Sequence, residues 1–347
     1  MATPDAELIA PIGGFFELHE PDGALAGASV LEVWTEGRPY AAFVNARSAF
    51  AALAAAMPRA NLWLPAFLCG DLVDPSFGAR VRFYPVDEGF VPDLARVEAE
   101  AQAGDLVLVA AYFGLPVAPG VRDFAARRSD LRIVEDRAQA LGPGLDTVGG
   151  WTLYSPRKLL GVADGGLLVA PAGQATLPQP TSSADSVALW RAPLLRRADP
   201  LGRDNAVWHA ANRAKEAAMA VTSQAMTDAS RSILSRTSLA SLAGPRLANW
   251  RILDRRLRAW SALPADPSAP PLGYVLRLAP AAREALLRGL HAERIFAAVH
   301  WPMIAAATAD FPREAQWTLE LVTLPCDHRY GAADMDRIAA RVTELLR

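Results

Sequence analysis

Lysine is nearly absent from this chain. The 347 residues include 35 lysine and arginine residues, of which only Lys158 and Lys215 are lysine. Arginine stays protonated in proteins, whereas a lysine amine can lose its proton and form a Schiff base with a carbonyl group. Lys215 lies in an alanine-rich helical stretch, and we interpret it as an exposed surface charge. Lys158 lies between an apolar stretch and a Gly-Gly pair, and the presence of a rare lysine in this setting requires a chemical explanation. We expect its apolar neighbours to bury the side chain, and burial lowers the pKa of a lysine amine.

Cysteine, net charge and long apolar runs are also scarce. The two cysteines, Cys69 and Cys326, are far apart and too few for a disulfide framework or a zinc site, so we expect no metal. A formal charge of −2 with scattered arginines argues against a nucleic-acid partner. No apolar run approaches the ~18 residues of a membrane span. The first residues include acids and prolines, unlike a signal peptide, and we therefore expect a cytoplasmic protein.

The first two-thirds of the chain alternate apolar runs with helical stretches. A chain of 347 residues with 52% hydrophobic residues exceeds what one core usually supports, so we expect two domains. The pattern predicts strands at 40–45, 60–67, 79–86, 105–114, 131–136 and 151–154. It predicts helices at 46–57, from about 70, at 92–104 and at 119–129. This alternation is typical of an α/β fold with a mostly parallel central sheet.

The second half of the chain differs in composition and in its predicted secondary structure. Residues after about 172 form a Pro- and Ser-rich loop, and residues 184–262 are mainly helical in pattern. A long helix at 240–260 is expected to join two domains. Strands at 274–278 and 321–325, with helices at 283–295 and near the end, predict a smaller α+β unit. We therefore predict a large α/β domain at 1–239 and a small C-terminal α+β domain at 240–347, which includes the linking helix.

Several chemically distinctive residues follow the predicted strands. Ligands of open α/β sheets bind at the carboxyl ends of the strands. The segments in question are Asn45–Ser48, Pro65–Phe67, Tyr112–Gly114 and Glu135–Asp136 with Gln139. Each is unspecific by itself, because an Asp that follows a strand is as often a helix cap as a ligand. Their common position at one sheet edge is what favours a binding site.

The order and spacing of these segments resemble the DegT/DnrJ/StrS family of sugar-nucleotide aminotransferases. The segment VEDRAQALG is similar to the family's I-E-D-A-A-Q-A-L-G. The segment SPRKLLGVADGGLLV is similar to Y-P-G-K-N-L-G-x-G-E-G-G-x-V-V, with the lysine and the glycine pair in register. The segments VNARSAF, WLPAF, AYFGLP, AVHWP and LVTLPCDHRYGAADMDRI are similar to further landmarks of the family. The resemblance extends from about residue 40 to the end of the chain.

This resemblance implies the fold and the cofactor site of a pyridoxal 5'-phosphate (PLP) enzyme. The implied fold is the aspartate aminotransferase-like fold, also called fold type I. Lys158 would form the Schiff base, Asp136 would face the pyridine nitrogen and Gln139 the phenolic oxygen of the ring. Ala46, Arg47 and Ser155 would hold the phosphate. The family has an aromatic ring that stacks on PLP at the position of Cys69, and we expect Phe67 or another aromatic residue to replace it here.

The resemblance also implies a reaction and an assembly. It implies a homodimer that transfers an amino group to a nucleotide-linked keto-sugar, with glutamate as the amino donor. His300 and His328 lie in segments similar to substrate-facing loops of the family, while a structural role is the more frequent one for histidine. Trp301 is expected to fill the core of the small domain. The alternatives are another PLP enzyme that acts on a small amino acid or ketone, and a family member that serves as a scaffold or regulator.

Overall fold

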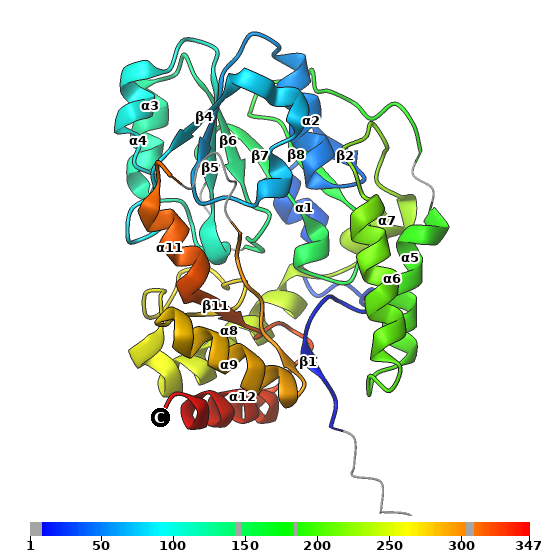
Figure 1. Cartoon of the computed structure of the whole chain (residues 1–347). Coiled ribbons are helices and arrows are strands. Elements are labelled where there is room, and N and C mark those ends of the chain that lie inside the picture. The colour runs from blue at the N-terminus through cyan, green and yellow to red at the C-terminus, as the bar shows by residue number, and fades with distance from the viewer. Residues whose placement is uncertain (1–8, 143–146, 184–185, 303–308) are drawn as a thin grey trace, which may run out of the picture.

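A seven-stranded sheet forms the centre of the computed structural model, which describes residues 9–142, 147–183, 186–302 and 309–347 (Figure 1). The strand order is β2-β8-β7-β6-β5-β3-β4. The strands are β2 (Tyr40–Phe43), β3 (Leu62–Pro65), β4 (Val81–Tyr84), β5 (Leu106–Ala110), β6 (Arg132–Asp136), β7 (Trp151–Tyr154) and β8 (Gly166–Val169). β8 is antiparallel to both neighbours, and the other pairs are parallel. The predicted α/β class and mostly parallel sheet are thus confirmed, although β8 was not predicted.

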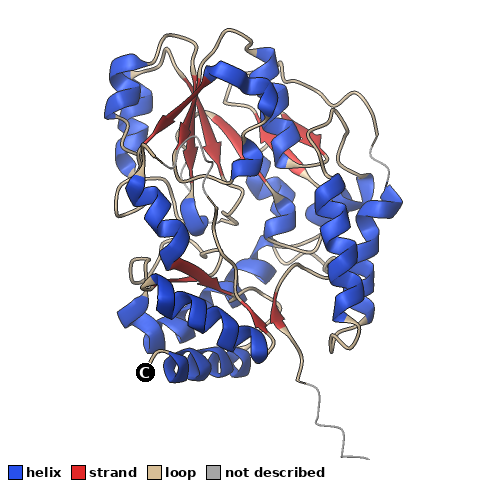
Figure 2. Ribbon diagram, in the orientation of Figure 1, coloured by secondary structure: helices blue, strands red, loops and turns tan. Residues whose placement is uncertain are grey.

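Helices cover the sheet, as Figure 2 shows. Those that precede the strands of the first half are α1 (Val30–Thr35), α2 (Ala46–Ala56), α3 (Ala95–Glu100) and α4 (Pro119–Arg127). α2 begins at an Asn45 cap, whose side chain accepts a hydrogen bond from the Ser48 amide, and buries Phe50 and Leu53 against the sheet. The predicted helix from about residue 70 is wrong. Two short 3-10 helices, η1 (Gly70–Leu72) and η2 (Pro75–Arg80), take its place, because Asp74 before Pro75 adopts extended backbone geometry with a ψ of 136°.

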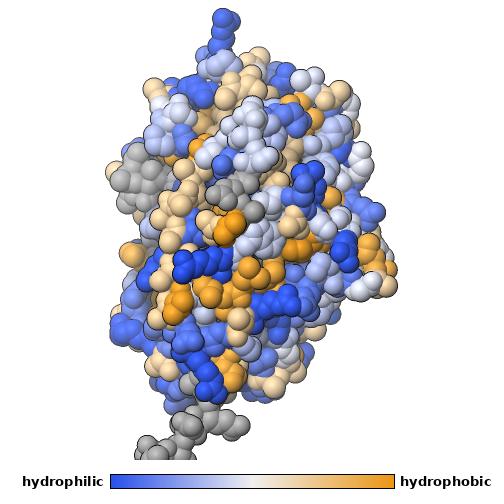
Figure 3. Space-filling view, turned by 90° about the vertical axis from the view of Figure 1, so that its right-hand side faces the viewer, coloured by the Kyte–Doolittle hydropathy of each residue, from blue (hydrophilic) through white to orange (hydrophobic). Residues whose placement is uncertain are grey.

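The second half begins with a layer of helices beside the sheet. These are α5 (Ser186–Ala198), α6 (Asn205–Ala218), α7 (Asp228–Ser235) and the long α8 (Leu239–Leu257). α5 and α6 pack against each other on the flank that faces the viewer in Figure 3, where apolar groups lie among polar ones. Leu194 of α5 and Val207 of α6 are about half exposed there, at 48% and 51%.

A second hydrophobic core lies below the main sheet. It is built from α8, α9 (Pro280–Ala292), α12 (Ala332–Leu345) and the antiparallel pair β9 (Tyr274–Arg277) and β11 (Leu321–Leu324), with α11 (Pro312–Glu320) nearby. The N-terminal strand β1 (Ile12–Gly13) pairs in parallel with β10 (Ile295–Phe296) and adds Ile12 to this core. α8 begins one residue before the proposed boundary at 240, and the division into 1–239 and 240–347 stays a prediction.

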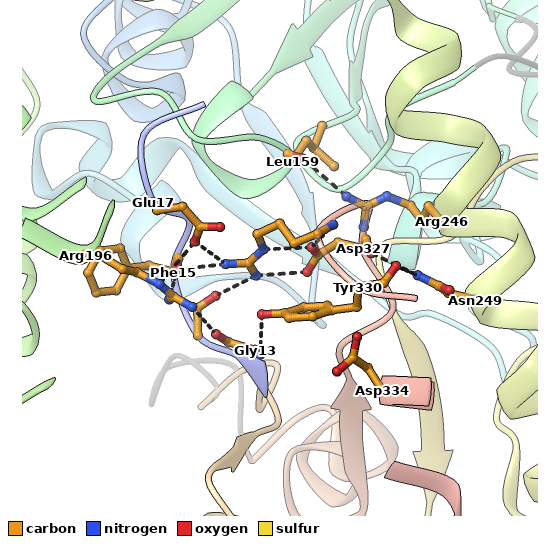
Figure 4. Close-up of polar contacts among 12 residues, drawn as sticks. Gly13, Phe15, Glu17, Leu159, Arg196, Arg246, Asn249, Asp327, Tyr330 and Asp334 are labelled. Carbon is orange, nitrogen blue, oxygen red and sulfur yellow. Dashed lines mark hydrogen bonds and ion pairs between the residues drawn. The ribbon is translucent and has the colours of Figure 1, made fainter. Parts of the chain in front are cut away.

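A buried ion-pair network holds the N-terminal segment against both cores (Figure 4). Arg329 donates from Nε and Nη2 to the two carboxylate oxygens of Asp327, at 2.8 and 2.9 Å, and from Nη1 to Glu17 at 3.0 Å. Arg196 of α5 donates to the Gly13 carbonyl at 2.8 Å and pairs with Glu17 at 3.2 Å. These bonds hold residues 13–17 in place between α5 and the loop before α12.

We expect Asp327→Asn to destabilise the protein strongly. The substitution leaves the buried Arg329 guanidinium with only Glu17 as a carboxylate partner, and breaking a buried ion pair costs about 3 kcal/mol or more. Urea denaturation at pH 7 measures the loss of unfolding free energy. Glu100→Gln is the matched control, because it removes the exposed pair with Arg96, and it should change little. Equal effects of the two substitutions would contradict the structural role of Asp327.

Candidate active site

Two hollows adjoin at the carboxyl edge of the main sheet, and Lys158 lies between them. The inner cavity, of about 130 Å³, is lined by six of the predicted site residues: Ala46, Arg47, Asp136, Gln139, Ser155 and Lys158. The outer chamber, of about 430 Å³, lies between the sheet edge and the second core and is lined partly by residues 13–16. Arg157, Lys158 and Trp301 line both hollows. An amine at Lys158 can therefore meet one molecule held in the inner cavity and another that enters the chamber.

The strand register brings Asp136 and Lys158 to the same cavity. β6 and β7 are parallel, and Asp136 lies opposite Leu153. The chain leaves β7 after Tyr154, passes Ser155 and makes one 3-10 turn, η4 (Pro156–Lys158). Because side chains alternate between the faces of a sheet, this register decides which face receives the carboxylate of Asp136. Sequence reasoning grouped these residues correctly from their positions after strands.

Asp136 and Gln139 form the polar wall of the inner cavity. Burial raises the pKa of Asp136, while the charge of Lys158 and a hydrogen bond from the Ala138 amide, at 2.8 Å, act in the opposite direction. Such a carboxyl group is stabilised by a cationic or hydrogen-donating partner in the cavity. Gln139 accepts from the Phe113 amide through Oε1 at 2.8 Å, but its buried Nε2 has no hydrogen-bond partner among the described residues. A ligand acceptor in the cavity would satisfy that N–H group.

The two lysines are placed opposite to our sequence-based expectation. Lys158 was expected to be buried among apolar neighbours, but its side chain is exposed to the hollows. Lys215 was interpreted as an exposed charge, and this was wrong: only 5% of its side chain is accessible. Burial and the neighbouring charge of Arg157 lower the pKa of Lys215 to about 8. Helix α6 carries Lys215 on its inward face, and the alanine-rich sequence around it did not indicate which face would be covered.

The opposite end of the inner cavity favours an anion. α2 begins there at Ala46, so the positive end of its dipole lies at the cavity. Arg47 donates to Asp71 at 3.2 Å and to the Met219 carbonyl at 2.7 Å. Ser155 lies on the facing wall. The structure thus brings together the three residues that were predicted to hold a phosphate group.

The outer chamber is aromatic and basic. His300 lines it, with Nδ1 3.0 Å from the Thr323 hydroxyl, and burial together with the charge of Lys158 lowers the His300 pKa to about 3. The imidazole is therefore neutral at physiological pH. Arg246 and Arg329 also line the chamber, with Arg246 donating to the carbonyls of Leu272 and Leu159. Trp301 forms part of the walls of both hollows rather than only filling a core.

Two predicted residues lie outside both hollows. Phe67 was expected to replace the stacking aromatic, but it is fully buried in an aromatic cluster, with its ring 5.3 Å from that of Trp301. His328 was a candidate for substrate contact, but it stacks on Phe16 at 5.6 Å and does not line the chamber. In both cases the chain passes the site while the side chain turns away from it, which a linear sequence pattern does not reveal.

Sequence reasoning missed Arg157 and Glu216, which face the inner cavity and form an ion pair. Arg157 precedes Lys158 and Glu216 follows Lys215, so the two rare lysines could have drawn attention to these neighbours.

Across the described ranges, no cluster of three or more His, Cys, Asp or Glu side chains could hold a metal ion. In the same part of the chain, no helix is both long and apolar enough to cross a membrane.

The inner cavity fits a pyridoxal phosphate group. Its partly buried Asp136 carboxyl group suits a protonated ring nitrogen, and the unpartnered Gln139 amide suits a ring oxygen. The amino end of α2 suits a phosphate. Cys69 occupies the wall where an aromatic ring was expected, and Trp301 is the aromatic side chain that lines the cavity.

Known structures share this fold. The structure is similar to the putative sugar aminotransferase Spr1654 from Streptococcus pneumoniae in its PMP form, with a TM-score of 0.67, 13% identity, and 96% of this chain and 98% of that chain covered. It is also similar to a DegT DnrJ EryC1 StrS aminotransferase from Brucella abortus (TM-score 0.63, 17% identity, 93% and 91% covered). A third similar structure is 3-amino-5-hydroxybenzoic acid synthase (TM-score 0.63, 18% identity, 92% and 89% covered).

These similarities confirm the expected fold, that of the fold type I aminotransferases, over more than nine-tenths of the chain. No family model and no curated protein matches the sequence.

The buried position of Lys215 predicts a specific pH dependence of stability. Folded Lys215 loses its proton near pH 8, whereas the unfolded residue does so near 10.5. Between these values the unfolded chain binds more protons, so the contribution of Lys215 to stability rises with pH and is lost as pH falls toward 8. The free energy of unfolding of Lys215→Met should therefore exceed that of wild type at pH 8. This difference should shrink by up to about 3 kcal/mol toward pH 10.5.

Urea denaturation at several pH values measures that difference. Arg213→Met, an exposed position on the same helix, is the matched control and should run parallel to wild type. A Lys215→Met curve that also runs parallel to wild type would contradict the burial of Lys215.

Proposed function

We propose that the protein is a PLP-dependent aminotransferase with Lys158 as its catalytic lysine. The observation that carries this proposal is the arrangement around one cavity of an exposed lysine amine, a partly buried carboxyl group and an unpartnered amide. The cavity opens beside a chamber large enough for a second molecule. The fold of aminotransferases supports the same conclusion.

The cofactor would supply an electron sink, and the chain would hold and tune it. Asp136 would accept a hydrogen bond from the protonated ring nitrogen and keep it protonated. Gln139 would donate from Nε2 to the ring oxygen. Ala46, Arg47 and Ser155 would bind the phosphate, and Trp301 would shield the cavity from water. The lining of the inner cavity by these side chains supports the assignments.

Lys158 would serve as both attachment point and proton carrier. Its Nζ can attach the cofactor only in the neutral form, because a protonated amine has no lone pair. Once the amino donor has displaced Lys158 from the cofactor, the free Nζ can take the proton from the α-carbon of the donor. It can then deliver that proton to the carbon atom that carries the new amino group. An exposed position between cavity and chamber permits both tasks.

The finer proposal is that the acceptor is a nucleotide-linked keto-sugar and the donor glutamate. The chamber beside Lys158 presents Arg246 and Arg329, which suit anionic substrates, and a neutral His300 that can donate or accept a hydrogen bond. A different PLP reaction on a small amino acid or ketone is the second candidate, because 3-amino-5-hydroxybenzoic acid synthase has a similar structure. A scaffold or regulator without cofactor is the third, and it gives no role to Lys158.

We further propose a homodimer in the cytoplasm. The half-exposed Leu194 and Val207 on the packed helices α5 and α6 are apolar surface of the kind that association covers. Two-fold dimers are the commonest assemblies of soluble chains.

Lys158→Arg should abolish cofactor attachment without unfolding the protein. Arginine keeps the charge and much of the length, and position 158 is exposed, but a guanidinium offers no lone pair for attack. Wild-type protein mixed with PLP should show a visible absorbance band of the attached cofactor, and Lys158→Arg should not. Lys215→Met is the matched control and should retain the band at saturating PLP. A band of equal strength in Lys158→Arg would overturn the proposal.

Asp136→Asn should slow amino transfer far more than it weakens cofactor binding. The substitution keeps the shape but removes the negative charge that holds a proton on the ring nitrogen. Stopped-flow spectroscopy of the half-reaction with glutamate should show a rate at least about 100-fold lower, comparable to the loss of other charge-stabilising groups. A wild-type rate would mean that Asp136 only accepts its local bond from Ala138.

A further inference from the structure

Both lysines of the chain lie beside the same arginine. Arg157 immediately precedes Lys158 in η4, and its side chain lines the inner cavity and the outer chamber. Arg157 Nη1 forms an ion pair with the Glu216 carboxylate of α6. Lys215 Nζ lies 3.7 Å from the same Glu216 oxygen. One carboxylate is thus shared by a cation in the cavity wall and a buried cation behind it.

The position of this triad is set by α2 and α6. The chain that follows α6 is bonded to the start of α2: Asn45 Nδ2 donates to the Ala220 carbonyl at 3.2 Å, and the Thr222 amide donates to Ser48 Oγ at 3.0 Å. Glu216 lies one turn before that junction. It therefore lines the same cavity as the amino end of α2, where the helix dipole favours the anionic group of a ligand.

Glu216 is charged in this position. Although burial acts to raise its pKa, the attraction of Arg157 and Lys215 and the hydrogen bond from Arg157 lower it below the usual value. A carboxylate and a phosphate dianion near one guanidinium repel each other, so they cannot both pair with Arg157 without a cost. Glu216 and a bound phosphate group therefore compete for the same donor.

We propose that Arg157 belongs to the phosphate subsite and that Glu216 is its intramolecular competitor, with Lys215 as the cation that receives the displaced carboxylate. This inference rests on the proposed use of PLP. It adds to Ala46, Arg47 and Ser155 a cationic group that can donate more than one hydrogen bond to phosphate. It also explains why a buried amine stands behind a carboxylate that is 41% exposed: the carboxylate can turn from Arg157 to Lys215 without losing a counter-charge.

Glu216→Gln tests the competition. The amide keeps the shape but removes the negative charge, so PLP should bind on the order of tenfold more tightly. Pyridoxal, which lacks the phosphate group, should bind wild type and variant equally. Titrations followed by the visible band and by tryptophan fluorescence measure both ligands. Glu344→Gln, at an exposed pair with Arg341 far from the cavity, is the matched control and should change neither affinity.

Lys215→Met tests the receiving cation. Without Lys215 the carboxylate has only Arg157 as a close partner, so PLP should bind several-fold more weakly while pyridoxal binding is unchanged. The double variant Lys215→Met with Glu216→Gln should bind PLP as tightly as Glu216→Gln alone, because the displaced carboxylate no longer exists. A PLP affinity of the double variant that is as low as that of Lys215→Met would overturn the role of Lys215.

The failure of this inference is distinguishable from failure of the proposed function. Unchanged PLP affinity in Glu216→Gln, or an equal gain for PLP and pyridoxal, overturns the competition while leaving the function intact. No visible band with wild type overturns the proposed function. In that case, calorimetric titration with inorganic phosphate tests the phosphate subsite independently of PLP. Tighter phosphate binding by Glu216→Gln than by wild type supports the subsite, and equal binding by the two proteins overturns it.

Discussion

The parallel pairing of β6 with β7 is the constraint on which the site depends. It sets Asp136 opposite Leu153, so that a single short turn after β7 returns Lys158 to the cavity that Asp136 faces. A slip of one residue would turn Asp136 to the other face of the sheet and remove the carboxyl group from the cavity. The buried apolar residues of β5, which pairs with β6 over five residues, resist such a slip.

The charged groups around the cavity make its two ends differ in the ligand charge that they favour. Lys158, the proposed reactive group, is exposed, whereas Gln139 and Ser155 are buried and Asp136 is partly buried. Asp136 is held in a setting that favours a cationic partner, and Arg157 already has an anionic one in Glu216. One end of the cavity thus suits a protonated ring and the other a phosphate group, which is the polarity that PLP requires.

The sequence predicted the central sheet and six of the residues that line the inner cavity, because both depend on local pattern. Apolar runs predicted β5 and β6, and the positions of Asp136 and Ala46 at or just after the ends of strands predicted that both lie at the same sheet edge. The missed features depend on contacts between distant segments. The burial of Lys215 arises from packing of α6 near residues 157 and 164, and the orientation of Phe67 and His328 arises from aromatic neighbours more than ten residues away.

Reduction with borohydride in the presence of PLP, followed by peptide mapping, tests the central claim most directly. The chain offers only two lysines, one exposed between the hollows and one buried behind the cavity wall. The account predicts a stable pyridoxyl adduct on the peptide that contains Lys158 and none on the peptide that contains Lys215. An adduct on Lys215 alone, or no adduct on either peptide at saturating PLP, would contradict it.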